Sequence, residues 1–368
     1  TSIVFPPAWA RTKESASLLA QTLCASFDAA ARHVAVLRFD YAETLGESHR
    51  ATRGADTGRE ALGLTVSGCV GDIGAAINTA IEQLDGRVDH LVLIGMSFSG
   101  PLCLRVAATD PRVDALVQLM GASDIQDLVR TASGGVDYVA RHLGGERAGV
   151  QNVLGLLSDT DRWCKDGLER GLLRLPDALR DAARLTVPLL WIHGEHDAFV
   201  NGARVRRLMD ASGAPQRRLA VVPCGHVPSQ TDEALVSFAP LVSGLLGADA
   251  LVAPSKVVIA EVTGAEWAAF PRERLASPED YWRSYMLGEQ RDDLGYDVLT
   301  LTREYQEMMA LQADLLELAP GDEVHDIGGG RGYAVPYLAR AAGGELGVHL
   351  YDLVPQALEQ APGRCAPY

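Results

Sequence analysis

Hydrophobic and polar positions alternate regularly over the first two thirds of the chain. Short apolar runs of strand type are followed by longer segments in which apolar residues recur at helical spacing. This alternation is typical of a parallel sheet whose strands are connected by helices. We therefore predict an α/β fold for residues 1–247. The expected strands are Ile3–Phe5, Val34–Phe39, His90–Ile94, Ala115–Met120, Pro188–His193 and Arg218–Pro223.

Two stretches depart from this pattern. Strand-type runs stop between Asp124 and Leu185, so we predict a helical insertion at about residues 125–185. Residues 248–278 are rich in Ala, Pro and short polar residues and are predicted to be a linker. Residues 279–368 are then predicted to contain a Leu-rich helical lead-in followed by a strand, a helix and a second strand.

Composition narrows the class of protein. The 368 residues include 48 acidic and 33 basic side chains, a formal net charge of −15. This balance disfavours nucleic acids and anionic membranes as partners, because both select cationic surfaces. No apolar run approaches the about 20 residues of a membrane-spanning helix, and the first residues do not resemble a signal peptide. The six cysteines form no Cys-x-x-Cys pair, which indicates reduced thiols and a cytoplasmic location. Oligomeric state is left open.

The segment Leu91–Gly100 carries the strongest chemical signal. Its apolar run leads directly into Gly-x-Ser-x-Ser-Gly with Ser97 at the centre, and a helical segment follows at once. A strand, a tight turn and a helix in this order form a nucleophile elbow, in which a strained turn exposes a serine hydroxyl above the sheet edge. The common pattern has Gly two places after the serine, where this chain has Ser99. The alternative is an ordinary serine in a loop between strand and helix.

A nucleophilic serine needs an imidazole to accept its proton and a carboxylate to orient that imidazole. Asp197 follows the expected strand Pro188–His193, and His226 follows the last expected strand of residues 1–247. Open α/β sheets place their sites at the carboxyl ends of strands, and the order serine, acid, histidine suits this kind of sheet. We predict Ser97, Asp197 and His226 as the catalytic residues, with Asp124 as a rival acid.

The surroundings of Asp197 also allow a metal interpretation, since His193, Glu195, His196 and Asp197 are all potential ligands. Side chains so close together along a tight turn do not converge easily on one ion. We therefore predict no metal site and interpret His193 as a structural residue of the turn.

An oxyanion hole requires two backbone N–H groups near the serine. One should be that of Phe98. The other should come from the loop after the first strand, where Pro6 and Pro7 have no N–H to donate. Trp9 is the first choice and Ala8 the second, although Trp9 can also be interpreted as a hydrophobic anchor.

With these residues placed, residues 3–246 resemble the α/β-hydrolase superfamily. More narrowly, they resemble the acyl-transferase/thioesterase of luminous bacteria. The segments that carry the resemblance are Ile3–Arg11, Val36–Tyr41, Gly46–Ser48, the elbow, Gly121–Arg130 and Val136–Tyr138.

The resemblance implies that Ser97 is acylated by a thioester and that His226 activates water or another acceptor. It implies an acyl thioester as substrate, acyl carrier protein as a partner, no cofactor for the hydrolase, and an insertion that acts as a lid over an acyl pocket. The candidate pocket lining is Leu154, Leu156, Leu157, Trp163, Leu168, Leu172 and Leu173. The alternative is that these residues simply pack the lid onto the core. An acidic carrier protein would need a basic face, and the candidates are Arg204, Arg206, Arg207, Arg217 and Arg218.

A second motif closes a predicted strand near the end of the chain. Asp-x-Gly-x-Gly-x-Gly is followed by the predicted helix Tyr333–Ala342 and the strand Gly347–Tyr351, after which Asp352 is placed to bind ribose hydroxyls. The arrangement resembles the first βαβ unit of a class I S-adenosylmethionine-dependent methyltransferase. By that resemblance, the cofactor-binding residues are Asp326, Gly328, Gly330, Gly332 and Asp352. An NAD-type loop is the alternative, and His325 stands where an apolar residue is usual.

Only two strands of this Rossmann-like sheet are present, whereas such methyltransferases normally have seven. We therefore expect the chain to be an excerpt of a larger fused enzyme, with S-adenosylmethionine as a cofactor once the unit is completed. For the whole chain we predict a serine hydrolase of the thioesterase/acyltransferase type. The alternatives are a carboxylesterase for small oxygen esters and a non-catalytic hydrolase-like platform of a methyltransferase.

Overall fold

The structure is a computed structural model, which describes residues 1–49, 60–245, 257–271, 300 and 302–365. The chain divides into two compact units, Thr1–Leu275 and Ala276–Tyr368. Each unit is described by itself. None of the helices in the described residues combines the length and apolar character needed to cross a membrane.

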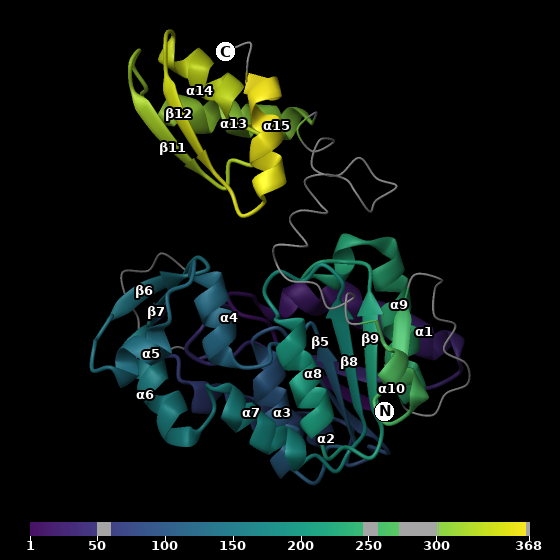
Figure 1. The fold of residues 1–368 in the computed structure, drawn as a ribbon. Coiled ribbons are helices and arrows are strands. Elements are labelled where there is room, and N and C mark those ends of the chain that lie inside the picture. The colour runs from purple at the N-terminus through teal and green to yellow at the C-terminus, as the bar shows by residue number, and fades with distance from the viewer. Residues whose placement is uncertain (50–59, 246–256, 272–299, 301, 366–368) are drawn as a thin grey trace. The chain divides into compact units, whose positions relative to one another are not determined.

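A seven-stranded sheet forms the centre of the first unit (Figure 1). The strand order is β10-β9-β8-β5-β4-β1-β2, and all neighbouring strands are parallel except β10, which is antiparallel to β9. The α/β prediction is thereby confirmed, because each of the six expected strands belongs to this sheet. The strands are β1 (Ser2–Phe5), β2 (Ala35–Arg38), β4 (Leu91–Met96), β5 (Ala115–Leu119), β8 (Leu189–Gly194), β9 (Arg217–Val222) and β10 (Val258–Glu261).

Helices cover both faces of the sheet (Figure 1). Successive side chains of a strand point to opposite faces, so Ile3 and Val4 belong to different hydrophobic clusters. One cluster is completed by α1 (Ser17–Ala29) and α9 (Asp232–Leu245). The helices of the other cluster are α2 (Val66–Gln83), α3 (Ser99–Thr109), α7 (Leu175–Ala183) and α8 (Gly202–Ala211).

The insertion is not entirely helical, so that part of the prediction was wrong. An antiparallel hairpin of β6 and β7 lies within it, and β7 also pairs with the short strand β3. Its turn contains Leu154 and Gly155, both with positive φ, where Asn-Gly is the usual signal. Because leucine is not a usual turn residue, the sequence did not indicate a hairpin here. The elements are β3 (Glu60–Ala61), α4 (Ile125–Ala132), α5 (Tyr138–Leu143), β6 (Val150–Val153), β7 (Leu156–Asp159) and α6 (Thr160–Arg170).

The predicted linker 248–278 contains structure as well, which corrects that boundary. Strand β10 extends the sheet beyond β9, and Arg218 forms an ion pair with Glu261 across this edge. Helix α10 (Ala265–Ala269) follows, and its Trp267 is buried and donates a hydrogen bond to Asp210 at 2.9 Å. Residues 246–256 and 272–278 of the predicted linker lie outside the described residues.

The second unit contains a two-stranded parallel sheet with helices (Figure 1). Strand β12 has the predicted bounds, and α14 begins two residues after the predicted start. A small cluster of Tyr333, Val354 and Ala357 lies in its core. Its elements are α13 (Arg303–Leu315), β11 (Glu323–Ile327), α14 (Val335–Ala342), β12 (Gly347–Tyr351) and α15 (Pro355–Cys365), the last of which the sequence analysis did not predict.

Candidate active site

Ser97 occupies a strained turn between β4 and α3. Its φ is +52°, a left-handed conformation that a residue with a Cβ rarely adopts. Close packing around the turn requires glycine at two positions. A Cβ on Gly95 would lie 2.9 Å from the Cβ of Cys103, and one on Gly100 would lie 2.6 Å from the Oε1 atom of Gln118. The motif therefore folds as the nucleophile elbow that its spacing predicts.

The structure brings together the three residues predicted to be catalytic. The Oγ atom of Ser97 lies 2.7 Å from Nε2 of His226, and Nδ1 of His226 lies 2.9 and 3.0 Å from the carboxylate oxygens of Asp197. A carboxylate only accepts hydrogen bonds, so Nδ1 carries the proton and Nε2 accepts from the serine hydroxyl. This is the arrangement needed to move a proton from serine to imidazole.

Asp197 is fixed by its own backbone turn after β8. The residue is only 2% exposed, and its Oδ1 atom accepts hydrogen bonds from the N–H groups of Phe199 and Val200 at 2.8 and 3.0 Å. The ring of Phe199 also packs on the imidazole of His226, with 5.1 Å between ring centroids. Both carboxylate oxygens of Asp197 are thus committed to the triad and its turn, which disfavours the metal interpretation of this segment.

The rival acid Asp124 has other partners. It caps α4 by accepting from the N–H of Asp127 at 2.8 Å and forms an ion pair with Arg204 at 2.7 Å. Burial raises the pKa of Asp124, and the hydrogen bond from the N–H of Asp127 and the charge of Arg204 reduce this rise without cancelling it. Asp124 therefore joins the insertion to α8. His193 is buried at the end of β8, which lowers its pKa, in keeping with a structural role.

Ser99, the departure from the common elbow pattern, has a defined contact. Its hydroxyl is fully buried and donates a hydrogen bond to the carbonyl oxygen of Pro7. Pro7 belongs to the loop after β1, from which the second oxyanion donor was expected. A glycine in place of Ser99 could not make this bond, so the extra hydroxyl joins the loop to the elbow.

The two predicted oxyanion residues lie against each other. The rings of Trp9 and Phe98 pack edge to face with 5.1 Å between centroids, and the indole Nε1 of Trp9 donates to the carbonyl of Val153 on β6. The Trp9 side chain is thus held between the elbow and β6, whereas the alternative interpretation was an anchor for the helix that follows it. Among the hydrogen bonds of the described residues, none is donated by the backbone N–H of Ala8, Trp9 or Phe98, so these groups remain candidates for an oxyanion hole.

A small pocket lies beside this loop. Only about 10 Å³ of it admits the centre of a water molecule, which is room for about one water. Of the leucines expected to line an acyl pocket, Leu156 does so, whereas Leu154 is 44% exposed at the hairpin turn. The pocket is lined mainly by residues 8–11, Tyr41, Leu64, Phe98 and Leu156.

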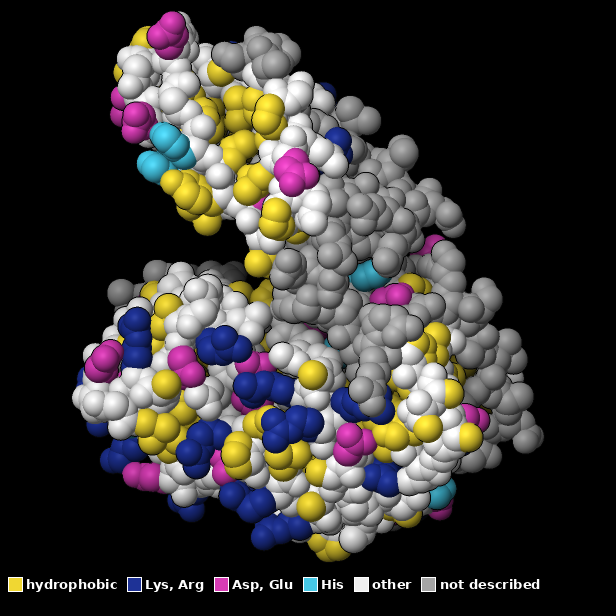
Figure 2. All heavy atoms as spheres, viewed as in Figure 1, with side chains coloured by type: hydrophobic (Ala, Val, Ile, Leu, Met, Phe, Trp, Pro, Cys, Tyr) yellow, Lys and Arg dark blue, Asp and Glu magenta, His cyan; other side chains and the backbone are white. Residues whose placement is uncertain are grey.

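Most of the arginines expected to form a docking face make contacts within the first unit. Arg204 pairs with Asp124, and Arg218 pairs with Glu261. Arg217 donates hydrogen bonds to backbone carbonyls at the end of α8. The guanidinium carbon of Arg206 lies 4.3 Å from the centre of the Trp267 ring, on which it stacks. Lys and Arg side chains nevertheless gather on the face that carries α4–α8 (Figure 2). Several acidic residues of those helices are buried instead, namely Asp127, Asp177 and Asp181.

The second unit has its own pocket, with a volume of about 430 Å³. Four of the five predicted cofactor residues line it, namely Asp326, Gly328, Gly330 and Asp352. Gly332 does not, and a Cβ there would lie 2.5 Å from the sulfur of Cys365. Gly332 therefore permits close packing against α15 rather than contact with a ligand.

The two carboxylates that line this second pocket differ in their hydrogen bonds. The carboxylate of Asp352 accepts from the N–H groups of Gly330 and Val354, both at 2.8 Å. The Oδ2 atom of Asp326, in contrast, is buried without a hydrogen-bond partner among the described residues. Burial and the negative charge of Asp352 raise the pKa of Asp326.

The chain is similar to several solved protein structures. The chain is similar to Est1E from Butyrivibrio proteoclasticus with ferulic acid bound, with a TM-score of 0.50 and 16% identity over 67% of this chain and 89% of that one. The first unit has the α/β-hydrolase fold.

Two further similarities are weaker. Monoacylglycerol lipase from Paleococcus ferrophilus has a TM-score of 0.45 and 16% identity over 67% of this chain and 93% of that one. The esterase domain of a Rhodothermus marinus protein has a TM-score of 0.43 and 19% identity over 66% of this chain and 84% of that one. No protein-family model and no curated protein sequence matches the chain.

Proposed function

We propose that the first unit is a serine hydrolase that works through an acyl-enzyme. The observation that carries the proposal is the continuous hydrogen-bonded line from Ser97 through His226 to Asp197. Its members come from three different loops, each after a strand of one sheet. A strained serine in such a line has few structural uses, because its conformation costs about 1–3 kcal/mol.

The geometry leads to a double-displacement reaction. The Oγ atom of Ser97 attacks the carbonyl carbon while His226 takes the hydroxyl proton, and Asp197 stabilises the resulting imidazolium. The oxyanion receives hydrogen bonds from the N–H of Phe98 and from that of Trp9 or Ala8. Collapse of the tetrahedral intermediate expels the thiolate or alkoxide, which takes the proton from His226. His226 then deprotonates a water, which attacks the acyl-enzyme. Collapse of this second tetrahedral intermediate releases the acid, and the Oγ atom of Ser97 takes the proton back from His226.

For the substrate class we propose an acyl thioester carried by coenzyme A or by an acyl carrier protein. The basic face over α4–α8 supports this, since phosphopantetheine and carrier proteins are anionic. An oxygen ester can react with the same serine, histidine and aspartate, so a carboxylesterase is the alternative. We also propose that the insertion serves as a lid over this site.

A fluorophosphonate probe tests the hydrolase proposal. We expect the intact chain to gain one probe mass and the label to map to Ser97, with no labelling of the Ser97→Ala variant. A matched control is Ser123→Ala, which removes another buried serine hydroxyl, one that donates to Asp124, and this variant should label normally. Labelling of Ser97→Ala to the wild-type extent would overturn the proposal.

A substrate panel then separates the two classes. Acetyl, butyryl and octanoyl thioesters of coenzyme A are compared with the matching nitrophenyl esters, using wild type and Ser97→Ala. A higher kcat/KM for the short thioesters supports the thioesterase. A preference for nitrophenyl esters of equal acyl length supports the carboxylesterase.

For the second unit we propose binding of S-adenosylmethionine. The unpartnered Oδ2 atom of Asp326 supports it, because this carboxylate oxygen faces a cavity of about 430 Å³ in which a ligand can donate a hydrogen bond to it. Asp326 and the glycine loop would hold the cofactor, and Asp352 would fix the loop by its bond to Gly330. The cofactor supplies a transferable methyl group when bound.

Equilibrium dialysis of the full chain with labelled S-adenosylmethionine tests this second proposal. We expect saturable binding that Asp326→Asn weakens, whereas the control Asp314→Asn, on α13, leaves it unchanged. Competition by NAD but not by S-adenosylhomocysteine would favour the NAD-type alternative.

A further inference from the structure

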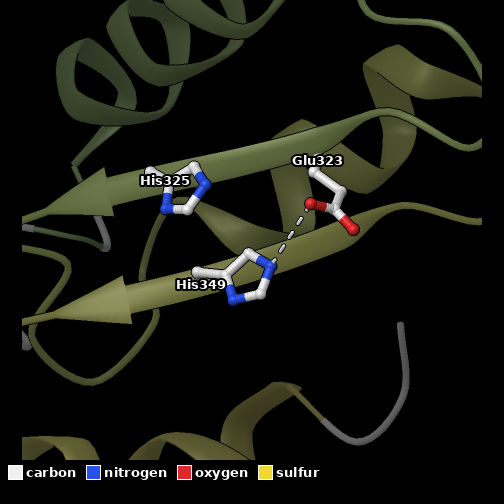
Figure 3. A group of neighbouring side chains, drawn as sticks. All are labelled: Glu323, His325 and His349. Carbon is white, nitrogen blue, oxygen red and sulfur yellow. Dashed lines mark ion pairs between the residues drawn. The ribbon is translucent and has the colours of Figure 1, made fainter.

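Two histidines and a glutamate share one exposed face of the sheet in the second unit. His325 on β11 is in register with His349 on β12. Glu323 precedes His325 by two positions and therefore points to the same face of the sheet. Figure 3 shows the three side chains side by side on the two strands. His325 is the residue that stood out in the sequence because an apolar side chain is usual there.

The donor atoms of these side chains lie close together. One nitrogen from each histidine and one oxygen of Glu323 all lie within 4.8 Å of one another. The Nε2 atom of His349 is 3.8 Å from the Oε2 atom of Glu323 (Figure 3). The two imidazole rings are stacked, with an angle of 12° between their planes and 4.8 Å between their centroids. In the part of the chain that the structure describes, no other group of potential metal ligands has this proximity.

A neighbouring hydroxyl prepares one histidine for metal binding. The Nδ1 atom of His325 lies 3.0 Å from the hydroxyl of Tyr351, at the end of β12. The tyrosine hydroxyl can accept a hydrogen bond from Nδ1–H, and in that tautomer the lone pair of Nε2 is left for a metal ion. Because the three donors are exposed, small side-chain rotations can bring them to the about 2.0–2.2 Å that Zn²⁺ requires.

We propose that Glu323, His325 and His349 form a transition-metal site that takes Zn²⁺. Two imidazoles and one carboxylate are a donor set that Zn²⁺ uses in proteins, with the fourth position open to water or another ligand. Imidazole nitrogen disfavours Mg²⁺ and Ca²⁺, which select oxygen ligands. The ion would join β11 to β12 on one face of the sheet. Asp326, the next residue after His325, points to the opposite face and lines the 430 Å³ pocket, so the metal site lies apart from that pocket. The prediction of no metal site was drawn from other residues, those around Asp197.

Titration calorimetry of the metal-free full chain with ZnCl₂ tests the proposal. We expect one equivalent of Zn²⁺ to bind in wild type and in the control His90→Ala, which removes an exposed histidine of the first unit. His349→Gln and His325→Gln should weaken this binding more than about 100-fold. Tyr351→Phe, which removes only the supporting hydroxyl, should weaken it about 10- to 100-fold.

Two further measurements make the result decisive. Co²⁺ should give the visible absorption of a site with nitrogen and oxygen ligands in wild type but not in His349→Gln. Circular dichroism establishes that each variant is folded. The proposal is overturned if wild type binds no Zn²⁺ at millimolar concentration, or if folded His349→Gln and His325→Gln bind it as wild type does.

Discussion

The two units place their pockets alike but satisfy the polar groups differently. In both, a strand of a parallel sheet runs into a glycine-containing turn and then a helix. In the first unit, Asp197 and His226 find their hydrogen-bond partners within the protein. In the second, an oxygen of Asp326 is buried without such a partner among the described residues. A site with satisfied groups is preorganised for proton transfer, whereas one with an unsatisfied group is suited to binding a ligand.

The largest expected effect concerns the acid of the triad. Asp197→Asn should lower kcat by about 10⁴-fold, because the amide favours the wrong tautomer of His226. Asp124→Asn, the matched change at the rival acid, should reduce kcat by less than about 10-fold. Steady-state kinetics on one activated ester measures both. Equal losses in the two variants would remove the distinction between catalytic and structural acid.

The next prediction concerns Ser99. Ser99→Ala should lower kcat about 10-fold, since the loop that offers an oxyanion donor loses its bond to the elbow, with a smaller change in KM. Leaving the carbonyl of Pro7 buried and unpaired should also cost about 1–3 kcal/mol of unfolding free energy. Ser99→Thr, which retains a hydroxyl, should recover part of the kcat. A purely structural role predicts a loss of stability with kcat unchanged in the folded fraction.

For the second unit, the raised pKa of Asp326 predicts a pH dependence of stability. A raised pKa in the folded state means that the contribution of this group is present below its ordinary value of about 4 and is lost as pH rises through the raised value. Asp326→Asn should therefore raise the unfolding temperature by a few degrees at pH 7 but not at pH 4. Thermal unfolding of both forms across this range measures the difference. A constant difference at all pH values would contradict the prediction.

The smallest expected effect lies in the hairpin of the insertion. Leu154→Asn should stabilise the first unit by about 1 kcal/mol, because asparagine tolerates positive φ better than leucine. Denaturant unfolding measures the gain. Leu143→Asn, at another exposed leucine of the insertion, should give none.

The sequence was most informative where a pattern was local. The strand before Ser97, the glycine turn and the following helix occupy one short segment, so the elbow was predictable. The positions of Asp197 and His226 followed from the same rule that sites lie after strands. Strand β10 was not predicted, because it lies in a segment rich in Ala and Pro. Strands β6 and β7 were not predicted, because leucine replaces a usual turn residue between them.

The alignment of strands and loops that are distant in the sequence could not be predicted from such local patterns. His325 was noticed as unusual, but its pairing with His349 depends on how β11 and β12 align. The contact between Ser99 and Pro7 depends likewise on the approach of two distant loops. Such contacts are fixed by tertiary packing, which no spacing along the chain encodes directly.

The indole of Trp9 has a mechanical consequence. It holds a carbonyl of β6 while its ring rests on Phe98. Any movement of the β6–β7 hairpin away from the elbow would either break the hydrogen bond between Trp9 and Val153 or move the loop after β1 together with the hairpin. The loop that is expected to carry an oxyanion donor is thus tied to the hairpin through a single side chain.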